Sequence, residues 1–444
     1  MTSSSRSVFD RIFQNASWLV IGSVVATALG AITSLLMARY LGAELYGKYA
    51  FAMAFVLIAS LFSTFGFDRV TLQDLVQKHF EENELMGTVA ILKLVGGVLV
   101  ILFSSVAALL WSTDAEVKII ILIASSSYLL RSISHLDVWF QKHLKSKYAT
   151  IALTAATLGS GLTKVLMIFL SMDVVYFSVA SVFEAAIFIG VMLYYFQKKG
   201  GTIQGWKVNG ACTKSILYRS WPLAFSALAG TIYTQFDRIM LGQFDSVSAV
   251  GIYALYVQVL RLPSVFFDAI VRSSSPILLD SFSNRPSIEF EEQLVRVLSL
   301  ITYLGIGFSI AFYLFGNQVI AYSIGEDFLT SLFVVGVLLV SFLLQIPNSF
   351  RVELLLLQGK ETVIFKLRLA SVLLNVILNL YAIPRYGIEG AAVATLITVF
   401  FFEVVCNLLT ETKFYLRFYL MSFRDAILQR PVAYMYRQLV RKTS

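Results

Sequence analysis

Long apolar stretches alternate with short polar stretches along the whole chain. A stretch of about 18–25 apolar residues is long enough to cross a bilayer as a helix. Helices are predicted in this way over residues 16–38, 49–67, 86–111, 118–139, 149–172, 174–196, 216–241, 250–272, 294–322, 329–350, 364–383 and 388–409. The pattern therefore predicts an all-α polytopic membrane protein with about twelve transmembrane helices.

A polar stretch with several glycines and lysines, residues 197–215, divides these helices into two groups of six. We expect an N-terminal lobe over residues 1–196, a cytoplasmic linker over 197–215 and a C-terminal lobe over 216–409. Residues 410–444 are predicted to form a basic amphipathic cytoplasmic tail, because arginines alternate there with aromatic and apolar residues. Residues 68–84 also carry an apolar face and are predicted to lie at the membrane interface.

The two lobes repeat each other at a spacing of 200 residues. Ala26, Gly30, Ser34 and Leu41-Gly42 correspond to Ser226, Gly230, Thr234 and Leu241-Gly242. The second copy then has four extra residues, after which residues 250–255 correspond to residues 46–51. Because each lobe has an even number of helices, both copies enter the membrane from the same side, which makes the repeat a parallel one. The small residues allow two interpretations: ordinary close helix packing, or helices that face each other or a cavity between the lobes.

Composition and charge agree with a membrane location. Hydrophobic residues make up 58% of the chain and charged residues 14%, whereas soluble proteins are about 45–50% apolar and about 25% charged. About 26 of the 35 Lys and Arg residues lie in the N-terminus, the even-numbered loops and the tail, and about five lie in the odd-numbered loops. Both termini are therefore predicted to be cytoplasmic, and the net charge of +8 reflects membrane topology rather than nucleic-acid binding.

Several classes of chemistry lack a sequence signal. The two cysteines and three histidines have no disulfide or metal-ligand spacing, and no phosphate-binding loop of the GxxxxGK[ST] type is present. No cofactor and no metal site are expected. The first apolar stretch is predicted to stay as a membrane anchor, since a cleavable signal would be shorter and differently flanked. Because no phosphate-binding loop is present, transport across the membrane would be driven by an ion or substrate gradient and not by ATP.

Charged residues inside the predicted helices are the candidate functional residues, because each is costly to insert into a bilayer. The basic ones predicted to line a cavity for an anion such as a diphosphate are Lys93, Arg131, Lys164, Arg261 and Arg39. The acidic ones predicted to titrate and couple transport to an ion are Asp268, Glu184 and Asp237. The cations are concentrated in the N-terminal lobe.

Each of these residues also has a structural interpretation. Arg39 and Asp237, near helix ends, could extend to the interface, as could the neighbouring Arg238. Lys164 and Glu184 could form a structural ion pair, and Arg261 could pair with Asp268. Arg131 and His135 are one turn apart, so a continuous helix would place them on one face.

Three separated motifs resemble one known family. Residues 38–50 (ARYLGAELYGKYA), residues 237–242 (DRIMLG) with 249–254 (AVGIYA), and residues 375–379 (NVILN) with 383–395 (IPRYGIEGAAVAT) are similar to the junctions of helices 1–2, 7–8 and 11–12. The family is the polysaccharide-transporter branch of the multidrug/oligosaccharidyl-lipid/polysaccharide (MOP) exporter superfamily. The resemblance covers essentially the whole chain, and of the charged residues inside its motifs only Arg39, Asp237 and Arg238 are carried over as candidate positions.

The resemblance implies two six-helix bundles that form a V around a central cavity, in the bacterial inner membrane. It implies a flippase of the Wzx type, which moves an O-antigen or capsule repeat unit on undecaprenyl diphosphate between leaflets, with coupling to H⁺ or Na⁺. Expected partners are the lipid-linked glycan, membrane lipids, a polysaccharide polymerase and a chain-length regulator. The alternatives are a multidrug-type exporter of the same superfamily, or a membrane glycan polymerase or ligase, which would be an enzyme.

Overall fold

The computed structural model describes residues 3–112, 114–280, 288–346, 350–351, 355, 360–406 and 413–428. Within these ranges the side chains of residues 3–17, 19–21, 265, 268–269, 272–280, 288–289, 361 and 413–414 are not described. The chain forms two compact units, residues 1–254 and residues 255–444. Each unit is treated by itself below.

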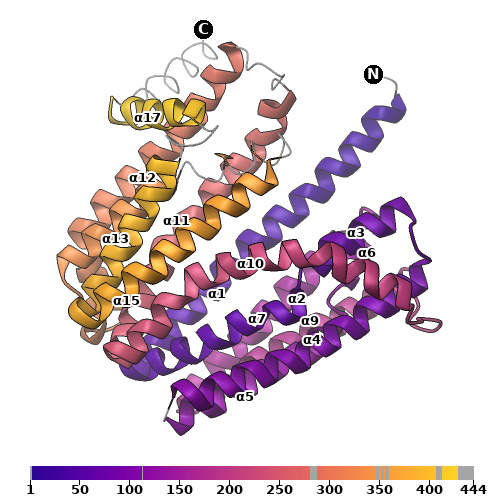
Figure 1. Ribbon diagram of the computed structural model, residues 1–444, viewed down its shortest axis with the longest axis horizontal. Helices are drawn as coiled ribbons and strands as arrows, with labels where there is room; N and C mark the ends of the chain where they lie inside the picture. Colours follow the sequence, from indigo (N-terminus) through magenta and orange to yellow (C-terminus); the bar gives the residue numbers. More distant parts are fainter. Residues whose placement is uncertain are drawn as a thin grey trace. The chain divides into compact units, whose positions relative to one another are not determined.

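The first unit is built from helices alone over its described residues (Figure 1). They are α1 (Ser3–Ala59), α2 (Leu61–Thr64), α3 (Phe67–Gln77), α4 (Glu82–Trp111), α5 (Ala115–Leu130), the 3₁₀ turn η1 (Arg131–Ile133), α6 (Leu136–Lys142), α7 (Lys147–Phe169), α8 (Val174–Phe177), α9 (Val179–Lys198), α10 (Gly210–Phe244) and the start of α11 (Val247–Asp280). Long helices α4, α5, α7 and α9 lie side by side, and α1 packs against α4, α5 and α7.

The second unit holds the rest of α11 and α12 (Ile288–Ser323), η2 (Glu326–Phe328), α13 (Leu332–Gln345), α15 (Glu361–Phe400), the π-helical turn η3 (Phe401–Val405) and α17 (Lys413–Ile427). Helix α13 packs between α12 and α15, and α17 lies across one end of α12 (Figure 1). The predicted tail therefore begins with a helix whose apolar face, including Tyr415 and Tyr419, is buried in the core of its own unit.

The predicted membrane class is confirmed. Among the described residues, eight helical stretches are long and apolar enough to cross a membrane. Helix α1 contains two helices joined at Gly42 (φ 72°), and α15 contains two joined at Gly387 (φ 52°), where a left-handed backbone suits glycine. With α10 and α13, which are predicted spans outside these eight stretches, the helices account for about twelve transmembrane segments.

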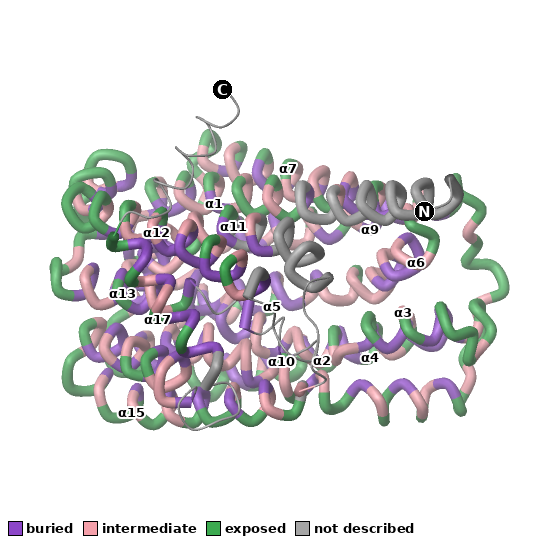
Figure 2. Tube along the Cα trace, turned by 90° about the horizontal axis from the view of Figure 1, so that it is seen from above, coloured by how far each residue is buried: buried purple, intermediate pink, exposed green. Residues whose placement is uncertain are grey.

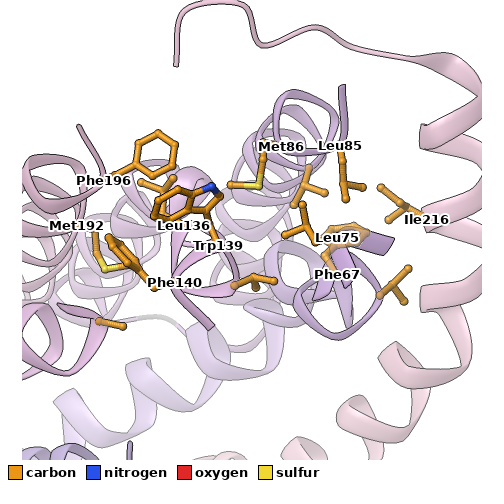
Figure 3. Packing of buried hydrophobic residues seen from close by; sticks show 14 of the residues in the cluster. Phe67, Leu75, Leu85, Met86, Leu136, Trp139, Phe140, Met192, Phe196 and Ile216 are labelled. Atoms are coloured by element: carbon orange, nitrogen blue, oxygen red, sulfur yellow. The ribbon is translucent and has the colours of Figure 1, made fainter. Parts of the chain in front are cut away.

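The outer and inner sides of the helices differ little in polarity. Figure 2 shows buried and exposed positions alternating along each helix, yet the exposed positions include Leu109, Phe169 and Tyr322, exposed by 69%, 82% and 91%. A helix that is apolar all round needs a membrane or a deep core to cover it. One cluster of buried side chains joins α3, α4, α6, α9 and α10 at one end of the first unit, around Trp139, Phe140 and Phe196 (Figure 3).

The sequence repeat has a direct structural counterpart within the first unit. Gly47 of the first copy and Gly251 of the second pack against each other's helices by backbone contact. A Cβ added to Gly47 would collide with the carbonyl oxygen of Val247, and one added to Gly251 would collide with the carbonyl oxygen of Ala43. Each added Cβ would also lie 3.1 Å from the other glycine's amide nitrogen. The contact is thus reciprocal: each glycine meets the carbonyl group four residues before the other glycine. A two-fold relation between the copies predicts this arrangement.

The small residues earlier in the repeat behave differently. No described atom lies within 4 Å of a Cβ added to Gly30 or Gly230, whereas Gly22 packs closely on Thr150. Close helix packing is therefore the wrong interpretation for Gly30 and Gly230. That these two glycines face a cavity stays a prediction.

The linker and the segment after it are held by side-chain contacts. Asn209 accepts hydrogen bonds from the first amides of α10 and donates to Glu84 of α4 at 2.9 Å. Helix α10 packs against α1, α3 and α4, so it belongs to the first compact unit. Residues 68–84, predicted to be interfacial, form α3 and the start of α4, with Val70 and Leu75 buried in the cluster of Figure 3. The lobe boundaries 1–196, 197–215 and 216–409 stay a prediction.

Candidate functional site

A break in the fourth predicted span positions Arg131. The span was predicted as one helix over residues 118–139, but α5 ends at Leu130 and the chain makes the 3₁₀ turn η1 before α6 begins. The amide of Ser134 donates to the carbonyl of Arg131 at 3.0 Å, which closes this turn. Because of the break, His135 is fully buried while the Arg131 side chain stays 35% exposed, so the prediction that the two share a face is wrong.

Arg131 meets two other charged residues of the first unit. Its guanidinium donates to Glu184 Oε1 of α9 at 3.2 Å. Lys164 of α7 and Tyr49 of α1 interact electrostatically with the same carboxylate. Two cations therefore share one anion, and the group carries a net charge of about +1 at neutral pH. Glu184 forms its ion pair with Arg131, so the predicted pair of Lys164 and Glu184 is at most a longer-range interaction.

This geometry permits anion exchange. The Arg131 and Glu184 side chains are each about one third exposed, 35% and 32%, so a ligand can reach them from outside the helix bundle. An arginine that holds a carboxylate can hold a phosphate in the same fork of N–H groups. An incoming diphosphate would therefore compete with Glu184 for Arg131, with Lys164 nearby as the second cation.

Lys93 has a different environment from the one predicted. Its side chain is 2% exposed, and its Nζ lies 2.6 Å from Asp68 Oδ1 and donates to Ser134 Oγ at 3.0 Å. Asp68 opens α3 and Ser134 follows η1, so Lys93 connects the segments that follow two helix breaks. The structure does not bring Lys93 into the group of Arg131, Lys164 and Glu184.

The same helix, α4, packs against both broken helices through adjacent glycines. A Cβ on Gly96 would lie 2.7 Å from Ser63 Cα, and one on Gly97 would lie 2.8 Å from the carbonyl oxygen of Tyr128. Just beyond Ser63 the chain turns through Phe65 (φ 39°) and Gly66 (φ 72°) before α3 begins. Gly96 and Gly97 thus let α4 approach the two backbone segments that precede the helix breaks. One turn earlier in α4, Lys93 contacts the two segments that follow the breaks, through Asp68 and Ser134.

The remaining predicted site residues are dispersed. Arg39 is exposed and forms no ion pair with the described residues. Asp237 is 5% exposed and accepts a hydrogen bond from Tyr253 Oη at 2.8 Å, which links the two helices of the second repeat copy. Arg261 is exposed in the second unit. The Asp268 side chain, and with it the predicted pair with Arg261, lies outside the described residues.

Sequence reasoning missed one ion pair in the second unit. Arg351 Nη1 lies 3.5 Å from Glu403 Oε2, and both side chains are 1% exposed. The Arg351 guanidinium also donates to the carbonyl of Phe402 at 3.1 Å and lies 4.3 Å from the centre of the Phe402 ring. Arg351 directly follows the predicted span 329–350, so it was not counted as an interior charge. Glu403 lies in the π-helical turn η3, a feature that a hydropathy pattern does not reveal.

No group of three or more His, Cys, Asp or Glu residues in the described part of the chain has the geometry of a metal site. The candidate site is the partly exposed group of Arg131, Glu184 and Lys164 between helices of the first unit. Together with the helical fold, it defines the class of protein: an all-helical polytopic membrane protein with charged residues inside its helix bundle.

Comparisons with known proteins give the family. The chain belongs to the family of polysaccharide biosynthesis proteins, whose model matches residues 12–282. It is similar to the capsular polysaccharide biosynthesis protein CapF of Staphylococcus aureus, at 23% identity over 52% of this chain and 58% of the relative. It is also similar to the probable flippase AglR of Haloferax volcanii, at 27% identity over 38% of this chain and 36% of the relative. The matches thus span only part of these relatives.

Solved structures share the fold. The lipid II flippase MurJ in an inward closed conformation superposes with a TM-score of 0.71 at 15% identity, over 94% of this chain and 92% of that one. An inward-facing multidrug resistance MATE transporter of the MOP superfamily superposes with a TM-score of 0.64 at 13% identity, over 89% and 95%. Identities this low establish the architecture alone. The family model thus confirms the predicted polysaccharide family, and the solved structures confirm the predicted transporter fold.

Proposed function

We propose that the protein is a flippase that moves undecaprenyl-diphosphate-linked oligosaccharide repeat units from the cytoplasmic to the periplasmic leaflet by ion-coupled alternating access. The observation that carries the proposal is the Arg131–Glu184 ion pair with Lys164 beside it, because the pair is accessible and the group of three has one cation more than anions. The family description and the relatives named as flippases support the same function. No covalent bond is made or broken.

In this mechanism the substrate exchanges with Glu184. The diphosphate takes over the N–H groups of Arg131, and Lys164 neutralises part of its second charge. The Glu184 carboxylate then loses its partner and becomes available to a cation. Release of the substrate restores the Arg131–Glu184 ion pair. Glu184 is thus the coupling carboxylate, and ion binding and substrate binding depend on each other.

We place the protein in the bacterial cytoplasmic membrane with both termini in the cytoplasm, on the basis of the lysine and arginine distribution. A polysaccharide polymerase and a chain-length regulator are the proposed partners. A reporter enzyme that works only in the cytoplasm should be active when it is fused to either terminus.

Deletion of the gene tests the function. Surface polysaccharide should be lost, and lipid-linked repeat units should accumulate facing the cytoplasm. Normal surface polysaccharide in a deletion strain without a second flippase would refute the proposed function. A changed drug-susceptibility profile with intact polysaccharide would favour the multidrug exporter, and turnover of lipid-linked sugar by the purified protein would favour an enzyme.

Complementation with variants tests the site. Arg131→Gln should lower polysaccharide export by about tenfold or more, since it removes one partner of a partly buried charge pair. Glu184→Gln should keep substrate binding and lose the dependence of transport on the ion gradient. Arg296→Gln is the matched control, because Arg296 forms an exposed pair with Glu292 within one helix. Export that is equal in the Arg131 and Arg296 variants would refute the assigned site.

A further inference from the structure

Four lysines gather where two packed helices of the first unit end. Helix α7 begins at Lys147 and α9 ends at Lys198, and each of these residues also ends a stretch long and apolar enough to cross a membrane. The two helices pack side by side, and the rings of Tyr148 and Tyr195 lie 4.7 Å apart between them. Lys145 precedes α7 and Lys199 follows α9. All four ammonium groups therefore lie near the level where a bilayer meets water.

Each lysine lies over an aromatic ring. The distances from Nζ to the ring centre are 5.6 Å for Lys145 and Trp139, 5.2 Å for Lys147 and Trp18, 5.3 Å for Lys198 and Tyr194, and 5.1 Å for Lys199 and Tyr148. Cation–π contacts of useful strength occur roughly once per 70–80 residues in proteins. Four such contacts at one pair of helix ends are therefore more than this average predicts. The rings restrict the lysines, which lowers the entropy lost when they bind an anion. We call the four lysines and the rings of Trp18, Tyr148 and Tyr194 the basic-aromatic surface; the Trp139 ring is buried.

The charge of this surface is not balanced by the protein. None of the four lysines forms an ion pair with a described carboxylate. The acidic residue that pairs in this region, Glu82, accepts instead from Lys142 and from the Trp139 indole. Lys147, Lys198 and Lys199 are exposed. About four positive charges are thus open to an external anion.

We propose that the basic-aromatic surface binds the phosphate groups of anionic phospholipid headgroups, such as those of phosphatidylglycerol or cardiolipin. A lipid fits better than a free phosphate for two reasons. Tyr and Trp rings favour the headgroup level of a bilayer, and exposed apolar side chains of α7, among them Leu153 (36%) and Leu158 (45%), follow the lysines along this helix into the predicted span. The lysines supply the charge, and the rings hold them at the depth of the lipid phosphates.

The test compares lipid binding by the full-length protein and two charge-matched double variants. Purified protein in neutral detergent is titrated with dioleoyl-phosphatidylglycerol or dioleoyl-phosphatidylcholine, and bound lipid is measured by native mass spectrometry. The K147Q/K199Q variant removes two surface lysines. The K78Q/K214Q control removes two exposed lysines that contact neither rings nor carboxylates within the described residues. A lysine near an anionic surface contributes about 1 kcal/mol, so K147Q/K199Q should lose the preference for phosphatidylglycerol by about 30-fold.

The wild type and the control should both prefer phosphatidylglycerol, and the preference should weaken with added salt. A Y148L/Y194L variant, with all four charges kept, should lose the preference by several-fold. Equal binding of the two lipids by the wild type, or an equal loss in both lysine variants, would overturn the proposal. Displacement of bound lipid by millimolar inorganic phosphate would instead identify the surface as a site for the free ion.

Discussion

The reciprocal contact between Gly47 and Gly251 makes a quantitative prediction for a single methyl group. In the Gly47→Ala variant the new Cβ would collide with the Val247 carbonyl oxygen and lie 2.8 Å from its carbon. Carbon atoms pack at about 3.5–4.0 Å, so the two helices would have to separate by roughly 1 Å at this point. Both opposing atoms belong to helix backbones, so no side-chain rotation can relieve the overlap.

The cost should be that of overpacking a tight interface, about 1–3 kcal/mol of unfolding free energy. Gly30→Ala is the matched control, because it adds the same methyl to the same helix α1 where no described atom lies within 4 Å. There the substitution should be neutral or stabilising by up to about 1 kcal/mol, since alanine restricts the unfolded chain.

The two variants can be compared by the apparent melting temperature of the detergent-solubilised protein, followed by tryptophan fluorescence at one fixed scan rate. Gly47→Ala should melt clearly below the wild type, and Gly30→Ala should melt with it or above it. Gly251→Ala should reproduce the effect of Gly47→Ala, because its Cβ would collide with the Ala43 carbonyl oxygen. If Gly47→Ala and Gly30→Ala melt together, the backbone contact does not exist as described.

Two further predictions concern ion pairs of the first unit. Lys93→Met should destabilise the protein by about 1–3 kcal/mol, and a double-mutant cycle with Asp68→Asn should show coupling, whereas additivity within about 0.5 kcal/mol would contradict the contact. For Asp114, burial acts to raise the pKa, but the hydrogen bonds from Lys48 and from the first amides of α5 outweigh it, and the pKa is lowered. A lowered carboxyl pKa contributes stability above the unfolded value of about 3.9 and loses it as the pH falls through the folded value. Asp114→Asn, which keeps the helix cap, should therefore melt below the wild type at pH 7, by about 1 kcal/mol or less for so exposed a pair, and the difference should shrink as the pH falls below about 3.9. A difference that persists unchanged at pH 3 would refute the assignment.

Some features of this protein could be predicted from particular residues. The apolar stretches predicted the approximate positions of the helices, because a bilayer requires about twenty apolar residues in every span whatever the neighbours are. Some ends were wrong, since α5 ends at Leu130 and not at residue 139. The repeat predicted that residues 46–51 and 250–255 are equivalent, and Gly47 and Gly251 proved to meet across it. The cations of the first lobe were predicted as a group, and Arg131 and Lys164 do lie near one carboxylate.

Other features depended on which side chains the fold brings together. Lys93 and Lys164 are both lysines inside predicted spans, but only the packing of α4 against two broken helices shows that Lys93 is paired with Asp68. The break at Arg131 was not predicted, although residues 131–137 (RSISHLD) are mostly polar, because this stretch was assigned to the end of one span over residues 118–139. Arg351 and Glu403 are 52 positions apart in the sequence and meet through the π-helical turn of η3.

The sequence alone thus determined the membrane class and the approximate helices, because the bilayer acts on each segment separately through its length and polarity. The tertiary structure decided which charges are paired, which glycines are in contact and where the helices break. Those outcomes depend on distances of a few ångströms between segments remote in the chain, where a buried charge is stable only beside its partner.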